Sequence, residues 1–494
     1  MYYSSTRDSS IRLTASEAVL KGLSDDGGLF VPSEFPTLPV SLEELADMDY
    51  KETAFAVMKG YLDDYTEDEL KACIDKAYDK KFDTEEIVPM AEADKAYYLE
   101  LFHGPTIAFK DMALSILPHL LTTAVKKNRS DKEVVILTAT SGDTGKAALA
   151  GFADVPGTRI IVFYPKDGVS NVQKLQMVTQ KGNNTFVVGV DGNFDDCQSE
   201  VKAIFGDAEL RKKMADAGFA FSSANSMNIG RLVPQIAYYV FAYGRLVKNG
   251  RIRPGDEINV CVPTGNFGNI LAAFFAKRSG LPIKTFICAS NDNKVLFDFF
   301  KSGVYDKNRQ FILTDSPSMD ILISSNLERL IYMSAGCDAQ KNKMLMESLS
   351  KEGKYEITPD MKEFMDSFVG EYADWAESSG KIRSLYENTG YIIDTHTAVA
   401  AAAYDKYVKE TGDKTVTVIA STASPFKFAR SVLKAIDKKY EDGEDFELIN
   451  ILSEKANVDI PPAIEEIRDA KVIHDTVCKR EGRRDYVLKN MGLR

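Results

Sequence analysis

The sequence predicts an α/β protein whose sheets are mostly parallel. From about residue 96 onward, short apolar runs rich in Val and Ile alternate with helical stretches. The runs are continuously apolar, which is typical of strands covered by helices on both faces. A hydrophobic fraction of 44% in 494 residues is ample for sizeable cores.

Residues 1–95 are expected to form a separate, mostly helical and polar region. Ser41, followed by Glu43 and Glu44, is typical of a capped helix start with an acidic first turn. Before it, residues 25–32 read as a turn that leads into an extended piece.

Two α/β lobes are expected after this region, residues 96–225 and residues 226–494. The apolar runs predicted to be strands are Val134–Leu137, Ile160–Phe163, Phe186–Val190, Ile258–Val262, Thr285–Cys288 and Val416–Ile419. Predicted helices between them include Ala147–Phe152 and Ile270–Lys277. Ligands of such sheets bind beyond the carboxyl ends of the strands, so the loops that follow the strands are the candidate binding loops.

The second lobe contains a segment of different character. Residues 306–381 are rich in Lys, Glu and Met and show no strand alternation. They are therefore predicted to form a helical insertion, either a lid or a surface excursion. The stretch from about residue 434 onward is charged and is expected to be mostly helical.

Charge and cysteine content exclude several classes of protein. The net charge of −12 and the pI near 5.1 argue against a nucleic-acid surface, which needs clustered Lys and Arg. No two of the six cysteines have CxxC spacing, and we expect no metal site. Because there is no apolar leader and no run of about 18 apolar residues, we expect a cytoplasmic protein that does not contact a membrane.

One lysine stands out. Lys110 lies in HGPTIAFKDMA (residues 103–113), where most of its neighbours are apolar or small. Burial disfavours an ammonium, so the pKa of Lys110 should fall and the free amine should become a usable nucleophile. An enzyme needs such an amine to form a Schiff base with a carbonyl cofactor. The alternative is that Lys110 caps a helix end or pairs with Asp111.

Two glycine-containing loops follow predicted strands and enter predicted helices. The first, TATSGDTGK at residues 138–146, offers hydroxyls and a helix N-terminus that suit a carboxylate; a capped helix without a ligand is the alternative. The second, PTGNFGN at residues 263–269, has the pattern that binds a phosphate through backbone N–H groups. It lacks the Gly-Lys-Ser/Thr of a P-loop, so it suits a single terminal phosphate such as that of pyridoxal phosphate.

A third loop, STASP at residues 421–425, follows the last predicted strand. A hydroxyl at the carboxyl end of a strand can hydrogen-bond a ring nitrogen. Unlike a carboxylate, a neutral hydroxyl does not hold that nitrogen protonated. The alternative is that this segment is a helix N-cap.

Together these segments resemble the threonine synthase family of fold-type II pyridoxal-phosphate enzymes, which share the fold of the tryptophan synthase β chain. HGPTIAFKDMA resembles the family's cofactor-lysine segment, TATSGDTGKAA its substrate loop and VPTGNFGNILA its cofactor-phosphate loop. SPSMD (316–320) and SSNLER (324–329) resemble a block particular to the family, and NSMNIGR (225–231) also matches it. The similarity runs from about residue 5 to about residue 430, and the length and insertion resemble the longer subgroup.

The chain departs from the family pattern in two places. The family often has Asp-Pro-His-Thr where residues 394–397 read DTHT, and Ser-Thr-Ala-His-Pro-Ala-Lys-Phe where residues 421–428 read STASPFKF. The changes at Thr395, Ser424 and Phe426 concern fine substrate contacts. Thr422, the residue that matches the family's ring-nitrogen contact, is kept.

The resemblance implies pyridoxal 5'-phosphate as the cofactor and Lys110 as the residue that binds it and then acts as a base. Other implied cofactor-binding residues are Gly265, Asn266, Phe267, Gly268, Asn269 and Thr422. The implied substrate-binding residues are Ser141, Gly142, Asp143, Thr144 and Gly145 for the carboxylate, with Lys146, Arg231 and Arg329 as candidates for the substrate phosphate or for ordinary salt bridges. The family's reaction is the conversion of O-phospho-L-homoserine and water to L-threonine and phosphate by γ-elimination and β-addition, and we expect a monomer or a homodimer.

Two other functions are open. One is a related fold-type II lyase, such as a dehydratase or a phospholyase; the SPSMD and NSMNIGR blocks argue against it. The other is a protein that binds pyridoxal phosphate without turnover, against which the intact Lys110, glycine loop and Thr422 argue. His103 and His396 are expected to be hydrogen-bonded structural histidines, with a proton shuttle as the alternative.

Overall fold

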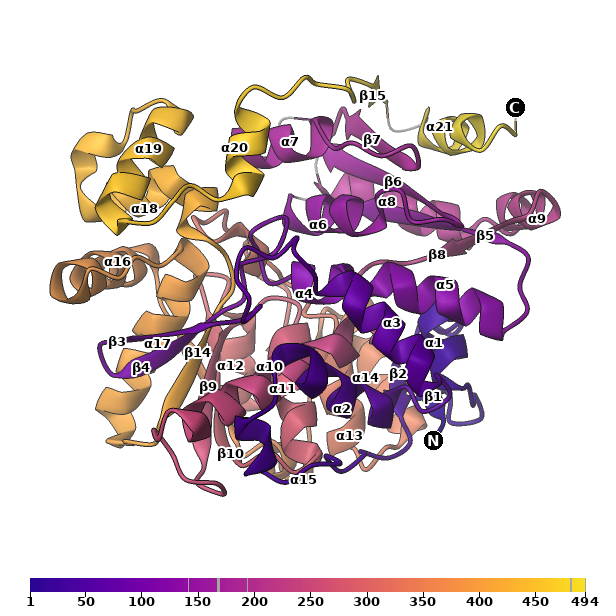
Figure 1. Cartoon of the computed structure of the whole chain (residues 1–494). Helices are drawn as coiled ribbons and strands as arrows, with labels where there is room; N and C mark the ends of the chain where they lie inside the picture. The colour runs from indigo at the N-terminus through magenta and orange to yellow at the C-terminus, as the bar shows by residue number, and fades with distance from the viewer. Residues whose placement is uncertain (141, 167–168, 193, 480–481, 494) are drawn as a thin grey trace.

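The structure, a computed structural model that describes residues 1–140, 142–166, 169–192, 194–479 and 482–493, contains two large sheets that confirm the predicted α/β class (Figure 1). The smaller sheet has the strand order β15-β7-β6-β5-β8 and is parallel throughout. Its strands are β5 (Glu133–Ala139), β6 (Thr158–Pro165), β7 (Thr185–Val190), β8 (Phe219–Ser222) and β15 (Val477–Cys478).

The larger sheet has the order β13-β10-β9-β14-β4-β3, and only its edge strand β3 is antiparallel to its neighbour. Its strands are β3 (Met90–Ala93), β4 (Ala96–Glu100), β9 (Ile258–Pro263), β10 (Ile283–Ser290), β13 (Phe368–Tyr372) and β14 (Thr417–Ser421). All six strands expected from apolar runs are therefore confirmed. Neither β4 nor β13 was among the predicted strands.

The larger sheet is apolar on both faces because helices cover both. Val260 and Val262 of β9 pack in the same cluster as α10 (Ile229–Lys248) and α11 (Gly268–Arg278). Cys261, between them, points to the opposite face and packs with α17 (Thr395–Thr411). Successive side chains of a strand alternate between faces, so a doubly covered strand has to be apolar at every position.

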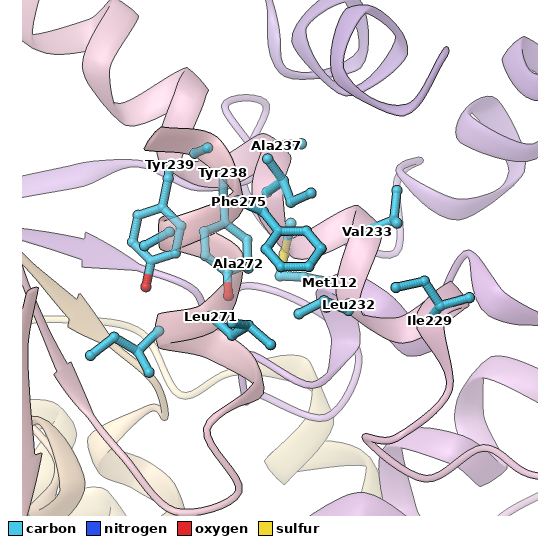
Figure 2. Packing of buried hydrophobic residues seen from close by; sticks show 14 of the residues in the cluster. Met112, Ile229, Leu232, Val233, Ala237, Tyr238, Tyr239, Leu271, Ala272 and Phe275 are labelled. Atoms are coloured by element: carbon cyan, nitrogen blue, oxygen red, sulfur yellow. The ribbon is translucent and has the colours of Figure 1, made fainter. Parts of the chain in front are cut away.

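Helix α10 joins the parts of the molecule in one core. Asn228 caps its first turn by accepting the N–H of Gly230, and every residue from Ile229 to Leu246 is buried. It contacts α2 (Tyr50–Tyr61), α4 (Asp111–Leu114) and α11. Figure 2 shows Leu232, Val233 and Tyr238 of α10 together with Met112 of α4 and Phe275 of α11. Each such fully buried side chain contributes about 1.5–3 kcal/mol.

The other helices of the first lobe and of the C-terminal stretch follow the prediction. The first lobe contains α5 (Leu117–Lys127), α6 (Asp143–Phe152), α7 (Asn171–Val178), α8 (Phe194–Gly206) and α9 (Ala208–Asp216). The C-terminal stretch contains α18 (Ala429–Ile436), α19 (Asp445–Ala456), α20 (Pro462–Arg468) and α21 (Arg483–Asn490). Over the described ranges, we find no helix that is both long and apolar enough to cross a bilayer.

The N-terminal region is less uniformly helical than expected. Besides α1 (Ala15–Lys21), α2 and α3 (Glu67–Ala77) it contains β1 (Tyr3–Ser5), which pairs antiparallel with β2 (Phe30–Pro32). Ser41 and Glu44 form the expected reciprocal cap, but the turn they start is a short 3₁₀ helix, Glu44–Ala46. A cap favours a helix start, while the length of the helix depends on packing.

The insertion is also not purely helical. It contains α13 (Leu327–Ser334), α14 (Ala339–Lys351), α15 (Pro359–Phe364) and the start of α16 (Trp375–Thr389), together with β11 (Val304–Asp306) and β12 (Lys354–Glu356). Its residues 368–372, FVGEY, form β13 at the edge of the larger sheet, where β13 pairs with β10 and contacts α12 (Val295–Ser302). This short strand depends on pairing with β10, which no local pattern signals. The boundaries at residues 95 and 225 remain a prediction.

We predict that replacing Gly151 with Ala destabilises the protein. A β-carbon at Gly151 of α6 would lie 2.1 Å from the carbonyl oxygen of Leu114 in α4, so the two helices would have to separate. The expected loss is roughly 1–3 kcal/mol, measured by urea unfolding.

The matched control is Gly380→Ala. Gly380 is an exposed residue of α16 with no atom within 4 Å of the added β-carbon, so this change should stabilise the protein by roughly 0.5–1 kcal/mol. Equal effects of the two changes would contradict the close packing of α6 on α4.

Candidate active site

The site lies where neighbouring parallel strands end. Strands β4, β14 and β9 are adjacent and parallel, so the loops that follow them meet at one edge of the larger sheet. Two of these loops are tied together: the Phe109 N–H donates to the Thr422 carbonyl at 2.8 Å, and the Ser424 N–H donates to the Ile107 carbonyl at 3.0 Å. These bonds place the backbone of the lysine segment beside Thr422.

Lys110 is largely enclosed, with 11% of its side chain exposed, close to the burial that the sequence predicts. It directly precedes α4, and its Nζ lies 3.3 Å from the Asp143 carboxylate and 3.3 Å from the Ser318 hydroxyl. Burial lowers the pKa of Lys110, and repulsion from Lys427 adds to the effect, against the opposing attraction of Asp143. The alternative partner, Asp111, accepts both the N–H and the hydroxyl of Thr106 instead.

The Asp143 carboxylate is the centre of the site. One oxygen accepts the Lys427 amine at 2.8 Å and the Gln173 amide at 2.9 Å, and the other faces Lys110 and the Ser318 hydroxyl, the latter at 3.0 Å. Burial alone would raise its pKa, but the ammonium groups of Lys427 and Lys110 hold the pKa of Asp143 well below its usual range. The site thus contains one buried carboxylate between two buried lysines.

The loop that leads into α6 has the compact shape expected of a ligand loop. Gly142 has φ of 144°, and a β-carbon there would lie 2.5 Å from the Gln173 side chain. The N–H groups of Gly142 and Gly145 both donate to the Thr140 hydroxyl at 2.9 Å. In this structure Thr140 therefore accepts two of the N–H groups that were expected to bind a substrate carboxylate. Ser141 lies outside the described residues, and Thr144 is half-buried.

The loop between β9 and α11 is suited to a phosphate. Phe267 has φ of 64° and precedes α11, whose N-terminus has no side-chain cap, so first-turn N–H groups are open to an anion. Gly265 has no room for a side chain, since a β-carbon would lie 2.6 Å from the Ser318 carbonyl oxygen. The buried Nδ2 of Asn269 has no hydrogen-bond partner within the described parts of the chain, and Asn266 is exposed at the loop's tip.

The three candidate cations differ in their surroundings. Arg329 is fully buried and donates to the Phe30 and Met227 carbonyls and to the Asn326 side chain, so its guanidinium holds the fold together. Lys146 donates to Gln180 at 2.6 Å, and burial lowers its pKa to about 8.

Arg231 is the candidate whose charge is least satisfied. It is buried and donates from Nη1 to the Ala224 carbonyl, while its Nε has no partner in the described structure. Burial lowers its pKa to about 10. A buried guanidinium without a carboxylate beside it is a ready site for an anion.

The insertion reaches the site through Ser318. His396 accepts the Ser318 N–H at its Nε2 at 3.1 Å, and its Nδ1 faces the buried Asp394 carboxylate at 2.8 Å. Because a backbone N–H can only donate, Nε2 is the acceptor and Nδ1 carries the proton. His396 is thus hydrogen-bonded in the way expected of a structural histidine, and it fixes the residue that touches Lys110.

Sequence reasoning missed several residues of this arrangement. Lys427 and Ser318 both lie in segments that match the family pattern, but neither was assigned a role. Lys427 could have been recognised as a lysine between two phenylalanines, five residues after Thr422. Gln173 had no signal, because its part in the site depends on how α7 packs against α6.

Models of known families match nearly the whole chain. They are described as threonine synthase N terminus (residues 2–78), pyridoxal-phosphate dependent enzyme (residues 90–422) and threonine synthase, C-terminal (residues 397–471). The second alone spans more than half of the sequence.

Individual relatives agree with these matches. The chain is 36% identical to the threonine synthase of Schizosaccharomyces pombe, across 94% of this chain and 98% of that protein. It is similar in structure to threonine synthase from Brucella melitensis, described as bound to pyridoxal phosphate, with a TM-score of 0.87, 32% identity and 99% coverage of both chains. It is also 41% identical to human threonine synthase-like 1 across 86% of this chain, but it spans only 58% of that protein's length.

His103, in the lysine segment, forms a charged cluster at the border of the site. Its Nδ1 lies 2.5 Å from Asp83 and its Nε2 lies 2.9 Å from Glu100. Burial alone would lower its pKa, but the hydrogen bonds to Asp83 and Glu100 outweigh burial and raise the pKa of His103 to about 9. The protonated imidazole therefore links Asp83, which precedes β3, to Glu100 at the end of β4.

This cluster predicts a pH dependence of stability. The pKa of His103 is higher in the folded than in the unfolded chain, where it is about 6.5. Its contribution is therefore complete below pH 6.5 and disappears as the pH rises through 9, by up to about 3 kcal/mol. Urea unfolding of the wild type and of His103→Gln between pH 6 and 10 measures it: the stability difference between the two should shrink across this range, and a constant difference would contradict the protonated cluster.

Proposed function

The chain belongs to the threonine synthase family of pyridoxal-phosphate-dependent enzymes, and from this membership we propose that it converts O-phospho-L-homoserine and water to L-threonine and inorganic phosphate. The observation that carries the proposal is a buried, low-pKa Lys110 at the edge where the phosphate loop and Thr422 also lie. We further propose a cytoplasmic monomer or homodimer.

The described residues fit the cofactor. The uncapped N-terminus of α11, the side-chain-free approach at Gly265 and the unpartnered Nδ2 of Asn269 suit its phosphate group. We assign the phosphate to residues 265–269 and the ring nitrogen to the Thr422 hydroxyl. When bound, pyridoxal phosphate supplies an electron sink that stabilises negative charge on carbons near the substrate amine.

Lys110 has two tasks in this proposal. As a neutral amine it would hold the cofactor at its aldehyde carbon, which an ammonium could not do. With substrate in the site, the free Nζ of Lys110 would accept the proton of the substrate α carbon and would serve the later proton transfers at the neighbouring carbons. The Asp143 carboxylate and the Ser318 hydroxyl each lie 3.3 Å from Nζ and 3.0 Å from each other, and they keep Nζ in place.

We assign substrate binding to the loop that leads into α6 and to Arg231. The loop of residues 141–145 is proposed to receive the carboxylate, with Thr140 yielding donors to it. Arg231, with its unpartnered Nε, is the preferred partner of the substrate phosphate. A guanidinium there would stabilise the charge that builds up as phosphate leaves the γ carbon. Arg329 is not proposed for this role, because its donors are used within the fold.

The test is a product assay with the pyridoxal-phosphate-loaded protein and O-phospho-L-homoserine. We expect threonine and phosphate in equal amounts. Lys110→Ala should reduce turnover by roughly a thousandfold or more, whereas Lys409→Ala, an exposed lysine of α17, should leave it unchanged. Phosphate accompanied by 2-oxobutyrate would favour a related lyase, and binding of the cofactor without any product would favour a protein that has lost turnover.

A second prediction concerns Lys427, proposed as a positioning residue. In Lys427→Met the Asp143 charge is no longer shared and the repulsion on Lys110 is lost, so the pKa of Lys110 should rise. Each unit of that rise lowers the fraction of neutral amine at neutral pH about tenfold.

The measurement is the rate at which cofactor-free protein takes up pyridoxal phosphate, followed by absorbance from pH 6 to 10. The midpoint for Lys427→Met should move to higher pH, while Lys427→Arg, which keeps the charge, should stay closer to the wild type. An unchanged midpoint in Lys427→Met would show that Lys427 does not tune Lys110.

A further inference from the structure

A cavity outside the active site lies behind the phosphate loop. Its volume is about 110 Å³, and its walls are formed by Phe299 and Phe300 of α12, Phe368 of β13, Ile357 and Met365. Most of these wall residues are buried. A cavity of about 150 Å³ with similar walls holds a benzene molecule, so this one has room for a small branched hydrocarbon group.

The cavity also has one side chain of each charge. Lys362 of α15 and Asp366, four residues later, line it and are exposed. Neither forms an ion pair with any described residue; Lys362 only donates to the Lys301 carbonyl at 2.9 Å, which leaves N–H groups free. An ammonium and a carboxylate at the border of an apolar cavity complement a molecule that has a carboxylate, an ammonium and a short apolar chain.

The walls of the cavity contact the phosphate loop through aromatic rings. The rings of Phe300 and Phe368 stack on each other with centroids 5.5 Å apart. Both also stack on Phe267, at 6.0 and 5.8 Å. Phe267 is the residue with φ of 64° that precedes α11, so its ring position and the conformation of the phosphate loop are linked.

We propose that this cavity binds a small α-amino acid with a branched aliphatic side chain, and that its occupancy changes the affinity of the phosphate loop for its phosphate group. The side chain would lie against Phe300 and Phe368, the carboxylate against Lys362 and the ammonium against Asp366. A ligand on these rings favours one arrangement of Phe267 over another. The coupling between the two sites is reciprocal.

Binding is tested by titrating the pyridoxal-phosphate-loaded protein with L-leucine in a calorimeter. We expect one saturable site, weakened roughly tenfold or more by Lys362→Met and by Asp366→Asn, because each removes a charge-assisted hydrogen bond. Met365→Phe, which fills the cavity, should abolish it. Glu363→Gln, an exposed neighbour on α15 that does not line the cavity, should bind as the wild type does.

Leucine is itself an amino acid and can also occupy the active site, which the variants distinguish. Binding that is unchanged in both Lys362→Met and Asp366→Asn would place leucine elsewhere and overturn the proposal. The absence of a saturable heat up to about 10 mM would do the same.

Coupling is tested by the concentration of pyridoxal phosphate that half-saturates the cofactor-free protein, with and without saturating leucine. We expect a change of roughly fivefold or more, lost in Met365→Phe. Leucine binding at the cavity without any such change would refute the coupling. None of these measurements requires turnover, so their outcome is independent of the proposed reaction.

Discussion

The active site depends on one buried carboxylate. Asp143 accepts from Lys427 and Gln173 on one oxygen and faces Lys110 and Ser318 on the other. Two buried lysines without it would repel each other, and a buried carboxylate without them would be strongly unfavourable. Burial lowers the pKa of Lys110, and repulsion from Lys427 adds to this effect, against the opposing attraction of Asp143. The surroundings of Lys110 thus favour the neutral amine that its proposed role as a nucleophile requires.

The fold brings these groups together from distant parts of the chain. Lys110 follows β4, Asp143 follows β5 of the other sheet, and Lys427 follows β14. Hydrogen bonds between residues 107–109 and 422–424 join two of these segments, and α10 packs against the helices of both lobes. Ser318 comes from the insertion and is fixed by the buried pair of His396 and Asp394. The insertion therefore contributes a residue to the candidate site, in addition to the edge strand β13 of the larger sheet.

Arg231 and Arg329 differ in what their guanidinium groups contact. Both are buried, and burial lowers the pKa of each to about 10. Arg329 donates to backbone carbonyls of β2 and of the segment before α10, whereas the Nε of Arg231 has no hydrogen-bond partner among the described residues. In the sequence, both are arginines in segments that match the family pattern, so the sequence alone did not distinguish their roles. Only their neighbours separate a guanidinium that fastens the fold from one that is open to an anion.

The sequence by itself determined six strands of the two large sheets, the three candidate ligand loops and Lys110 as the candidate reactive lysine, because these features are local. Continuous apolar runs mark strands covered on both faces, and a glycine turn between a strand and a helix indicates a candidate anion site. The strand β13, the charge balance at Asp143 and the roles of Lys427, Ser318 and Gln173 were decided only by the tertiary structure. Each of them depends on contacts between segments far apart in the chain, and neither an edge strand nor an ion pair has a pattern of its own in the sequence.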